Sequence, residues 1–594
     1  MEKAAIYHRP QSEMSYLAAK NVFQVRLRTK HADVDQVEII YGALDKIKAQ
    51  RGTDKDIKKM ARPQVDAMKL ILKTDLYDYW EAQIPVKVRE RTQYVFHLIS
   101  RDDEVLYDAI NARVYMADFL DNTTPFDTPY YQNMLLPHTA PEWSTKTVWY
   151  EIMIDRFANG SPQCDPIDVA DWQKDKSTKD NFFGGDFRGI IDHLDYLAGL
   201  GITGIKLSPI FESYSNLKDD PIDFYDLSML FGGKEDFREL VQKAHQHKIK
   251  VILQLPLDRL SDLSLQWQDV QMLGERSHFA SWFMIRDFPV TIPDEEHPQV
   301  NYLDIDGNVH MPKLNLQDTT VQQYLLETSR YWIETFDIDG WEILNGDEID
   351  PTFLNLFTKQ MHSIKSDFLV VGNYHYFPYQ ELAIDHIDSA NNVPFKTICN
   401  NFFIRQKINV SDMISQLNEE LMKNMTHINE VVINELENLD TPRLFDQCKG
   451  HSDLACAMLA FMFLQKGAPL LLYGTEVGVT GNGVPGNRAP MVWDEARQNQ
   501  NMLQFIKGLV GMRNDYPEIF KKGTLDWGQS SNKYRFFTLS REYEGKKIFS
   551  LFNLGFNNIK VVIPQNSQLI VSQSLNEEQS TIGPNGFMIL VMQN

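Results

Sequence analysis

The chain has few cysteines for its length. Four occur among 594 residues, far apart in the sequence, at Cys164, Cys399, Cys448 and Cys456. A disulfide framework needs more cysteines than this, and no pair has the Cys-x-x-Cys spacing that is typical of thiolate metal sites. We therefore expect neither class of site, and we expect the chain to work in a reducing, cytoplasmic compartment.

Basic charge and long apolar runs are also scarce. The chain has 81 acidic and 59 basic residues, which gives a formal net charge of −22. Such a charge repels nucleic acids and anionic membrane surfaces. The sequence contains no run of about 18 apolar residues that could span a bilayer, and its first residues lack the apolar segment of a signal peptide. We therefore expect neither nucleic acid nor a membrane among its partners.

The composition is that of a globular protein, and the apolar pattern changes twice along the chain. Residues 1–122 alternate short apolar runs with turns, which is typical of an antiparallel β-sandwich. The same pattern returns in residues 517–594 and predicts a second β-sandwich. Between them, residues 123–516 alternate apolar strands with amphipathic helices. The sequence thus predicts three domains with these boundaries.

The central domain has the pattern of an α/β TIM barrel. Eight such units predict a (β/α)8 barrel, whose chemistry lies at the C-terminal ends of its strands. About 70 residues separate the third strand from the next good helix, which predicts an excursion domain after strand 3, at about 258–315. The candidate strands lie near residues 149–156, 202–209, 251–257, 338–344, 368–374, 386–390, 430–436 and 469–474.

Five motifs support a resemblance to a known family. They are Asp155–Gly160 (DRFANG), Phe182–Ile191 (FFGGDFRGII), Met311–Asn315 (MPKLN), Phe336–Trp341 (FDIDGW) and Asn438–Arg443 (NLDTPR). In this order they resemble the neopullulanase, cyclomaltodextrinase and maltogenic amylase group of the α-amylase family of glycoside hydrolases. The resemblance covers nearly the whole chain. It implies a starch-binding-like N-terminal sandwich, a barrel with an excursion domain, and a C-terminal sandwich.

The resemblance also implies retaining hydrolysis of α-glucans. In that chemistry one carboxylate attacks the anomeric carbon, and a second, about 5 Å away, protonates the leaving oxygen. The nucleophile position is Leu344 here, and the general-acid position is Asn373. Leucine has no lone pair to donate, and an amide releases no proton near neutral pH. The third carboxylate, which holds the distorted sugar, is kept as Asp440. We therefore predict that no intact catalytic set remains.

Other sugar-clamping positions implied by the resemblance have changed as well. Many changes at one subsite, in a chain that keeps the scaffold motifs, indicate a site that has lost its hydrolytic role. The family's aspartate, asparagine and histidine after strand 3 are Gln254, Asp258 and Arg259. Its histidine and ring-stacking tyrosine after strand 2 are Leu217 and Asp219, its strand-4 arginine is Glu342, and its histidine before the third aspartate is Leu439.

Several of these residues have alternative roles. Glu342 should point into the barrel like Leu344, because strand side chains alternate with a period of two. We predict that Glu342 pairs with Arg259, with a new acid or base as the alternative. Asp440 either binds a sugar or pairs with Arg443. Leu344 and Leu439 are interpreted as core residues. The candidate ligand-binding residues are Asp440, Arg443, Glu342, Arg259 and Asp220.

Part of the calcium loop implied by the resemblance is present. Two other ligand positions hold Ser161 and Cys164, and a thiol is a poor ligand for a cation that prefers six to eight oxygens. We therefore expect that no cofactor is required and that calcium binds weakly or not at all. The matching positions are Asn159, Asp165, Gly184 and Asp186.

Three functions remain open from the sequence. The first is binding of an α-glucan, a maltooligosaccharide or a cyclodextrin without hydrolysis. The second is an active α-glycosidase or transglycosidase whose acid and base are drawn from Glu342, Asp258, Asp219 and Asp440. The third is a structural partner of an active paralogue. The resemblance also implies a homodimer.

Overall fold

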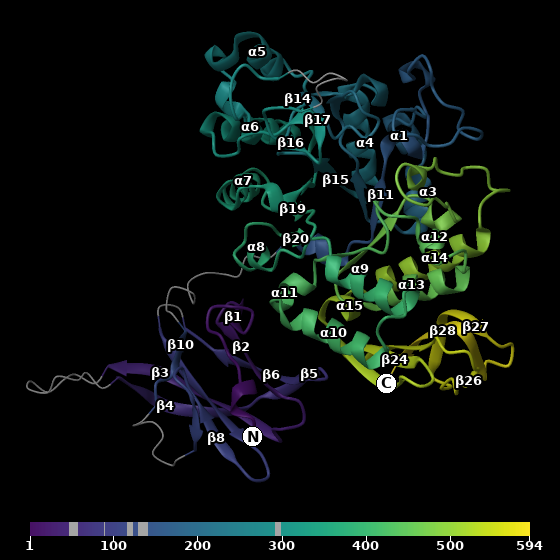
Figure 1. Cartoon of the computed structure of the whole chain (residues 1–594). Coiled ribbons are helices and arrows are strands. Elements are labelled where there is room, and N and C mark those ends of the chain that lie inside the picture. Colours follow the sequence, from purple (N-terminus) through teal and green to yellow (C-terminus); the bar gives the residue numbers. More distant parts are fainter. Residues whose placement is uncertain (47–57, 88–89, 116–122, 129–139, 292–298, 594) are drawn as a thin grey trace, which may run out of the picture. The chain divides into compact units, whose positions relative to one another are not determined.

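The computed structural model describes residues 1–46, 58–87, 90–115, 123–128, 140–291 and 299–593. It divides into two compact units (Figure 1). The first unit comprises Met1–Thr139 and Ile408–Asn429, and the second comprises Ala140–Lys407 and Glu430–Asn594. The domain boundaries at residues 122 and 516 stay predictions.

The first unit contains the expected pair of antiparallel sheets. Period-two alternation places Phe23, Val25 and Leu27 on the buried face of one strand, where none is exposed to solvent. One sheet has the order β1 (Ser15–Ala19), β2 (Val22–Lys30), β6 (Tyr77–Pro85) and β5 (Lys69–Lys73). The other has the order β4 (Lys58–Ala67), β3 (Gln36–Lys46), β7 (Thr92–Ile99), β8 (Glu104–Tyr107) and β9 (Ala112–Val114), with β10 (Phe126–Thr128) beside β7.

Two helices from the middle of the chain belong to this first unit. They are α10 (Val410–Met422) and α11 (Thr426–Asn429). Arg26 on β2 is buried and donates to the Asn424 carbonyl oxygen and to the Thr426 hydroxyl, both at 2.7 Å. A buried guanidinium needs such acceptors, so these contacts stabilise the helices against the sheet.

The second unit contains the predicted barrel. All eight strands are parallel and follow the order β20-β19-β18-β15-β12-β11-β22-β21. A parallel bridge between Asn391 and Ile433 closes the ring. The strands are β11 (Trp149–Ile152), β12 (Gly204–Leu207), β15 (Lys250–Leu255), β18 (Gly340–Ile343), β19 (Leu369–Gly372), β20 (Ser389–Ala390), β21 (Ile433–Asn434) and β22 (Ala468–Leu472).

Helices surround these strands, as Figure 1 shows. The longest, α6 (Thr319–Phe336), is the helix expected after the excursion segment, and Asp318 caps its N-terminus by accepting from the backbone N–H groups of Thr320 and Val321. None of the described helices combines the length and hydropathy needed to cross a bilayer. The others are α1 (Ile154–Phe157), α2 (Phe187–Asp192), α3 (Leu194–Leu200), α4 (Lys234–Gln246), α5 (Leu265–Leu273), α7 (Pro351–Ile364), α8 (Tyr379–Ala383), α9 (Val393–Cys399), α12 (Leu444–Gln447), α13 (Ser452–Leu464), α14 (Gln500–Asp515) and α15 (Pro517–Lys522).

Two insertions extend the loops after the second and third barrel strands. Strands β13 (Phe211–Ser213) and β14 (Pro221–Leu227) pair after β12. Strands β16 (Asp304–Ile305) and β17 (Asn308–Pro312) pair within the segment predicted as the excursion domain. Both insertions follow the C-terminal ends of barrel strands, where a TIM barrel carries its site.

The end of the chain forms an antiparallel sheet in which β28 pairs with three strands. Phe461 of α13 packs against Phe537 and Phe552 of this sheet, which joins the sheet to the barrel in the same unit.

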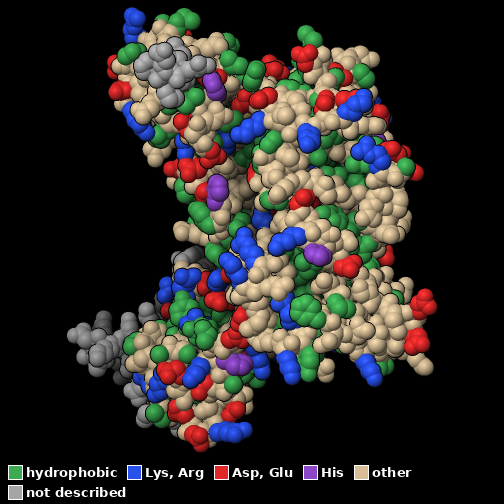
Figure 2. Space-filling view, turned by 45° about the vertical axis from the view of Figure 1, so that its right-hand side comes forward, with side chains coloured by type: hydrophobic (Ala, Val, Ile, Leu, Met, Phe, Trp, Pro, Cys, Tyr) green, Lys and Arg blue, Asp and Glu red, His purple; other side chains and the backbone are tan. Residues whose placement is uncertain are grey.

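Acidic, basic and hydrophobic side chains are interspersed over the face of the molecule shown in Figure 2. The strands of the C-terminal sheet are β23 (Thr524–Ser531), β24 (Phe536–Tyr543), β25 (Lys546–Asn553), β26 (Ile559–Lys560), β27 (Ser567–Leu575) and β28 (Thr581–Gln593).

Candidate functional site

Leu344 and Asn373 come together at the barrel mouth. Each directly follows one of two neighbouring parallel strands, β18 and β19, and the register pairs Ile343 with Gly372. The backbone N–H of Asn373 donates to the backbone carbonyl oxygen of Ile343 at 2.9 Å. Both side chains are half-buried. The two positions that the resemblance assigns to nucleophile and acid are therefore adjacent, and neither carries a carboxyl group. Leu439 is buried, as a core residue would be.

A fully buried polar layer lies inside the barrel, below this mouth. It consists of Glu151, Lys206, Gln254 and Glu342. The Lys206 ammonium lies 2.9 Å from Glu342 Oε1 and 3.1 Å from Glu151 Oε1. The Gln254 amide donates to Glu342 at 2.7 Å and to Glu151 at 3.0 Å. We call these four residues the polar layer.

The polar layer corrects one prediction from the sequence. Glu342 does point inward, but its partner is Lys206 and not Arg259. The strand register explains the difference. Gln254 lies opposite Glu342, whereas Arg259 lies beyond the end of β15. Sequence reasoning missed Lys206, and a signal was present. A lysine in the middle of an apolar strand needs a buried carboxylate to compensate its charge.

The charges in the polar layer shift each other's protonation. Burial disfavours the charged ammonium, but attraction from Glu151, Glu342 and Glu435 outweighs burial and raises the pKa of Lys206. Burial raises the pKa of Glu151 to about 7, although Lys206 opposes that shift. A charged Lys206 thus holds the carboxylate of Glu342, which leaves that group poorly placed to act as a new acid or base.

Charged groups beyond the strands form a second set at the mouth. Arg259 pairs with Asp258 at 2.8 Å, and both are buried. Asp219 is half-buried nearby. Burial raises the pKa of its carboxyl group, and attraction from Arg259 and Arg488 partly offsets that rise. Burial also raises the pKa of the neighbouring Asp220 carboxyl group, so both carboxyl groups of this loop are shifted toward the protonated form.

Asp440 is ion-paired with Arg488 at 2.9 Å, and 75% of its side chain is exposed. The alternative pairing with Arg443 is wrong. Arg443 is fully buried and donates to the backbone carbonyls of Asn487 and Tyr473, both at 2.7 Å. The Arg443 guanidinium thus donates to buried backbone carbonyls, and the Asp440 carboxylate lies at the surface, although only two residues separate them in the sequence.

A cavity of about 700 Å³ lies between the loops that follow β12 and β15. One of the five candidate ligand-binding residues, Asp220, lines it and accepts from the Ser215 hydroxyl at 2.5 Å. The Tyr214 side chain, 78% exposed, lies in the same wall and was not predicted from the sequence. The full lining is Lys179, Asp180, Phe182, Tyr214, Ser215, Asn216, Asp220, Ser261, Asp262, Leu263, Asn308, His310 and Met311.

Aromatic rings, a carboxylate and an amide around one cavity can bind a sugar. Aromatic faces pack against the C–H surface of a pyranose, and the polar groups accept or donate hydrogen bonds to its hydroxyls. Here Tyr214 and Phe182 supply the rings, and Asp220 and Asn216 supply the polar groups. The cavity has the size of an ordinary small-molecule site.

The residues of the predicted calcium loop bind one another and the backbone. Asp186 caps α2 and accepts from the backbone N–H groups of Gly189 and Ser161, at 2.6 and 2.7 Å. Asn159 turns its amide N–H₂ group toward Asp165, at 2.8 Å. Among the described residues, no three His, Cys, Asp or Glu side chains converge as metal ligands. Asn159, Asp165 and Gly184 thus lie together, and the carboxylates of Asp165 and Asp186 accept hydrogen bonds from protein groups.

Known proteins match the chain over nearly its full length. The α-amylase catalytic domain matches residues 151–544, and the α-amylase N-terminal Ig-like domain matches residues 1–132. The intracellular maltogenic amylase of Bacillus subtilis (strain 168) is 35% identical over 560 residues, which are 93% of this chain and 92% of that protein. The cyclomaltodextrinase of Geobacillus thermopakistaniensis is 30% identical and covers 100% of both chains.

A solved structure described as a cyclomaltodextrinase covers all of both chains with a TM-score of 0.88 and 26% identity. The matched catalytic domain, the matched N-terminal domain and the fold thus agree with the resemblance seen in the sequence. The chain belongs to the α-amylase family of glycoside hydrolases, among relatives named maltogenic amylase, cyclomaltodextrinase and neopullulanase.

Proposed function

We propose that the chain binds α-glucans, such as maltooligosaccharides or cyclodextrins, without hydrolysing them. One observation carries the proposal. Leu344 and Asn373 lie side by side at the ends of β18 and β19, where the family pattern requires two carboxyl groups about 5 Å apart. Neither leucine nor asparagine can form a glycosyl-enzyme bond or protonate a leaving oxygen.

The nearby charges support the same conclusion. The carboxylate of Glu342 is held by Lys206 in the polar layer, and that of Asp258 is held by Arg259. Asp440 is paired with Arg488 at the surface. A displacement at an anomeric carbon needs a free nucleophile and an acid on opposite sides of one bond. These three carboxylates are each paired with a cation.

The cavity beside Tyr214 and Asp220 supports α-glucan as the ligand class. It lies at the C-terminal ends of barrel strands, where this fold binds its ligands. The names of the relatives point to maltose-forming and cyclomaltodextrin-cleaving enzymes, whose substrates are built from α-linked glucose. A chain that kept this cavity and lost the two catalytic groups would bind such a ligand and leave it intact.

Paired binding and product assays test this proposal. The purified chain is incubated with maltotriose, maltoheptaose, β-cyclodextrin and pullulan, and calorimetry is run beside a reducing-end assay. We expect binding, weakened about tenfold by Tyr214→Ala or Asp220→Asn, and no reducing ends above those from Leu344→Ala. Turnover that Leu344→Ala abolishes, or the lack of any binding, would overturn the proposal.

An active glycosidase with rebuilt acid and base groups is the second candidate. The half-buried carboxyl group of Asp219 favours it, because burial raises its pKa, although attraction from Arg259 and Arg488 opposes that rise, and a general acid must start the reaction protonated. In that case Asp219→Asn should abolish turnover while leaving affinity intact. The pH profile of any residual activity should lose its basic limb.

Two further proposals follow from the resemblance and, for the second, from Ser161 and Cys164 at two positions of the family's calcium loop. We propose that the chain forms a homodimer and that it needs no cofactor. Sedimentation equilibrium at micromolar concentration should give about twice the mass of 68.9 kDa. A monomer at that concentration would contradict the first proposal, and loss of glucan binding in the presence of a chelator would contradict the second.

A further inference from the structure

Two neighbouring cavities flank a pair of tryptophans in the second unit. One has a volume of about 610 Å³ and the other about 290 Å³. Both are lined by Trp172, Gln173 and Trp493, so they form two halves of one surface. We call this surface the tryptophan groove. None of its lining residues lines the cavity beside Tyr214.

Both tryptophan rings are held in fixed positions. The indole N–H of Trp172 donates to the Met491 carbonyl oxygen at 2.8 Å, and that of Trp493 donates to the Phe157 carbonyl oxygen at 2.5 Å. His193 packs on the Trp493 ring at 3.7 Å between centroids. The rings are nevertheless only half-buried. Each ring thus presents carbon surface to the groove at little further loss of conformational entropy on binding.

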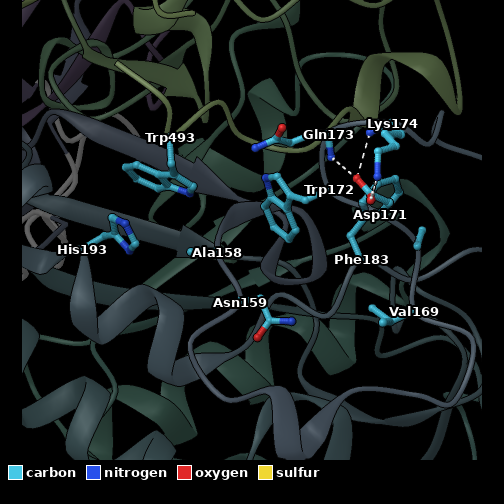
Figure 3. A pocket seen from close by; sticks show the side chains of 11 residues that line it. Ala158, Asn159, Val169, Asp171, Trp172, Gln173, Lys174, Phe183, His193 and Trp493 are labelled. Atoms are coloured by element: carbon cyan, nitrogen blue, oxygen red, sulfur yellow. Dashed lines mark hydrogen bonds and ion pairs between the residues drawn. The ribbon is translucent and has the colours of Figure 1, made fainter. Parts of the chain in front are cut away.

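Polar groups surround the rings. In Figure 3, Trp493, Trp172 and Phe183 succeed one another across the larger cavity, with Gln173 on one side and Asn159 on the other. Among the described residues, the Gln173 side-chain amide has no hydrogen-bond partner. It is exposed and free to bind a ligand hydroxyl.

The charges of the groove disfavour an anionic ligand. Its two cavities contain three acidic side chains, Asp171, Asp175 and Asp494, and two basic ones, Lys174 and Arg497. Lys174 is already paired with Asp171 at 2.8 Å. A phosphate or a nucleic acid would therefore meet a net negative surface. The groove fits a neutral ligand that has both apolar faces and hydroxyl groups.

We infer that the tryptophan groove is a second α-glucan-binding site. The choice of ligand rests on the proposed function. A glucose ring packs its C–H face on an indole and turns its hydroxyls toward amide groups such as that of Gln173. The groove has room for more than one ring, because its two cavities, of about 610 and 290 Å³, share Trp172, Gln173 and Trp493 as lining residues.

One loop joins the two sites. Phe182 lines the cavity beside Tyr214, and the next residue, Phe183, lines the tryptophan groove. A long glucan that engages both sites gains an effective local concentration at the second site once it is bound at the first. A short oligosaccharide engages one site at a time. Chain-length preference is thus the property that this groove adds.

The experiment compares short and long glucans on the full-length chain. Calorimetry is run with maltotriose and with soluble amylose on the wild type, Trp172→Ala and Gln173→Ala. We expect Trp172→Ala to weaken amylose binding at least tenfold and Gln173→Ala to weaken it about threefold, with maltotriose binding at the Tyr214 cavity unchanged in both. Trp143→Ala is the matched control. Trp143 is also half-buried and also donates its indole N–H to a backbone carbonyl, that of Asp367.

The outcomes separate the two proposals. If Trp172→Ala and Gln173→Ala both bind amylose like the wild type, the groove is no glucan site, while the proposed function stands. If Trp143→Ala weakens amylose binding as much as Trp172→Ala, the effect is not specific and the inference is also overturned. Hydrolysis by the wild type overturns the proposed function alone. Gln173 is exposed, so Gln173→Ala keeps the test valid if Trp172→Ala fails to fold.

Discussion

The barrel interior and the barrel mouth differ in how they accommodate unusual residues. In the polar layer, Glu342 replaces an arginine of the family pattern, and Lys206 and Gln254 bind it fully. At the mouth, Leu344 and Asn373 replace two carboxylates and are only half-buried. A charge in the interior must be paired because no water reaches it, whereas water solvates an unpaired group at the mouth. The interior therefore tolerates single changes far less than the mouth does.

Removal of the Lys206 charge should produce the largest effect. Lys206→Met leaves Glu151 and Glu342 buried without a cation, which should lower the free energy of unfolding by about 3–5 kcal/mol. Urea denaturation measures this. The matched control is Lys243→Met, because the side chains of Lys243 and Glu239 are only half-buried and their pair should change stability by less than about 1 kcal/mol. The double variant Lys206→Met with Glu342→Gln should recover part of the loss.

If Lys206→Met is as stable as Lys243→Met, the barrel interior is not more sensitive to single changes than the rest of the barrel. That result would mean that Glu151 and Glu342 take up protons at little free-energy cost once Lys206 is gone. A second measurement identifies this case. The stability of Lys206→Met should then fall steeply as the pH rises above about 4.5, because the unfolded chain releases the protons that the folded state keeps on both buried carboxyl groups.

The pH dependence of stability gives a smaller effect. Burial raises the pKa of Glu151 to about 7 from 4.5. The folded state therefore holds a proton that the unfolded state releases, and stability falls as the pH rises from about 4.5 to about 7. Glu151→Gln removes this term. Relative to the wild type, the free energy of unfolding of the variant should increase by about 1–3 kcal/mol between about pH 4.5 and pH 7. Above pH 7 the difference should stay constant.

Glu239, a half-buried glutamate outside the barrel interior, provides a control in which the pKa shift has the opposite direction. Hydrogen bonds from Arg188 and Lys243 lower the pKa of Glu239 to about 2. Its contribution is present above about pH 4.5 and is lost as the pH falls toward 2. Glu239→Gln should therefore lose a little stability relative to the wild type as the pH rises. If rising pH changed the stability of Glu151→Gln and of Glu239→Gln relative to the wild type in the same direction, the opposite pKa shifts of the two glutamates would be contradicted.

Local sequence patterns predicted the scaffold well. The eight barrel strands and α6 (Thr319–Phe336) repeat with regular periods, and the inward direction of Glu342 follows from the period of its own strand. These features depend on neighbours in the sequence. The Ig-like domain at the start of the chain was predictable for the same reason.

Partners across the barrel were not predictable in this way. Lys206 is 136 residues from Glu342, and only the closed register of the barrel brings the two together. Asp440 and Arg443 are close in the sequence, yet burial separates them. The tryptophan groove joins loops after the first and last barrel strands, so no local pattern indicates it. A tryptophan in a loop rich in aspartate and lysine was the one available signal.

Calcium should have a small effect. Asp186 caps α2 and Asn159 binds Asp165, so few oxygen ligands are free. With a Kd near millimolar, 10 mM calcium raises the free energy of unfolding by only about 1.4 kcal/mol. The melting temperature should shift by no more than about 4 °C between chelator and 10 mM calcium. Magnesium at 10 mM is the control for ionic strength. A larger shift that is absent in Asp186→Ala would reveal an intact site.

Substitution at the mouth should have the smallest effect. Leu344→Asp with Asn373→Glu restores both carboxyl groups at half-buried positions, and stability should stay within about 1 kcal/mol of the wild type. Turnover of maltoheptaose should not exceed that of Leu344→Ala. The reason lies in the polar layer, since Glu342 stands where the family pattern has an arginine and its negative charge disfavours a new anion above it.

Glu342→Arg cannot repair this arrangement alone. It would place a guanidinium next to the Lys206 ammonium in a buried layer where only the Glu151 carboxyl group remains, and the excess cation there should destabilise the fold. We therefore expect turnover only when Glu342→Arg and Lys206→Met are combined with the two mouth substitutions. Activity in the double variant Leu344→Asp with Asn373→Glu would show that the mouth works independently of the interior. In that case the barrel interior and the barrel mouth would differ in how their substitutions affect stability, and the interior would have no influence on catalysis at the mouth.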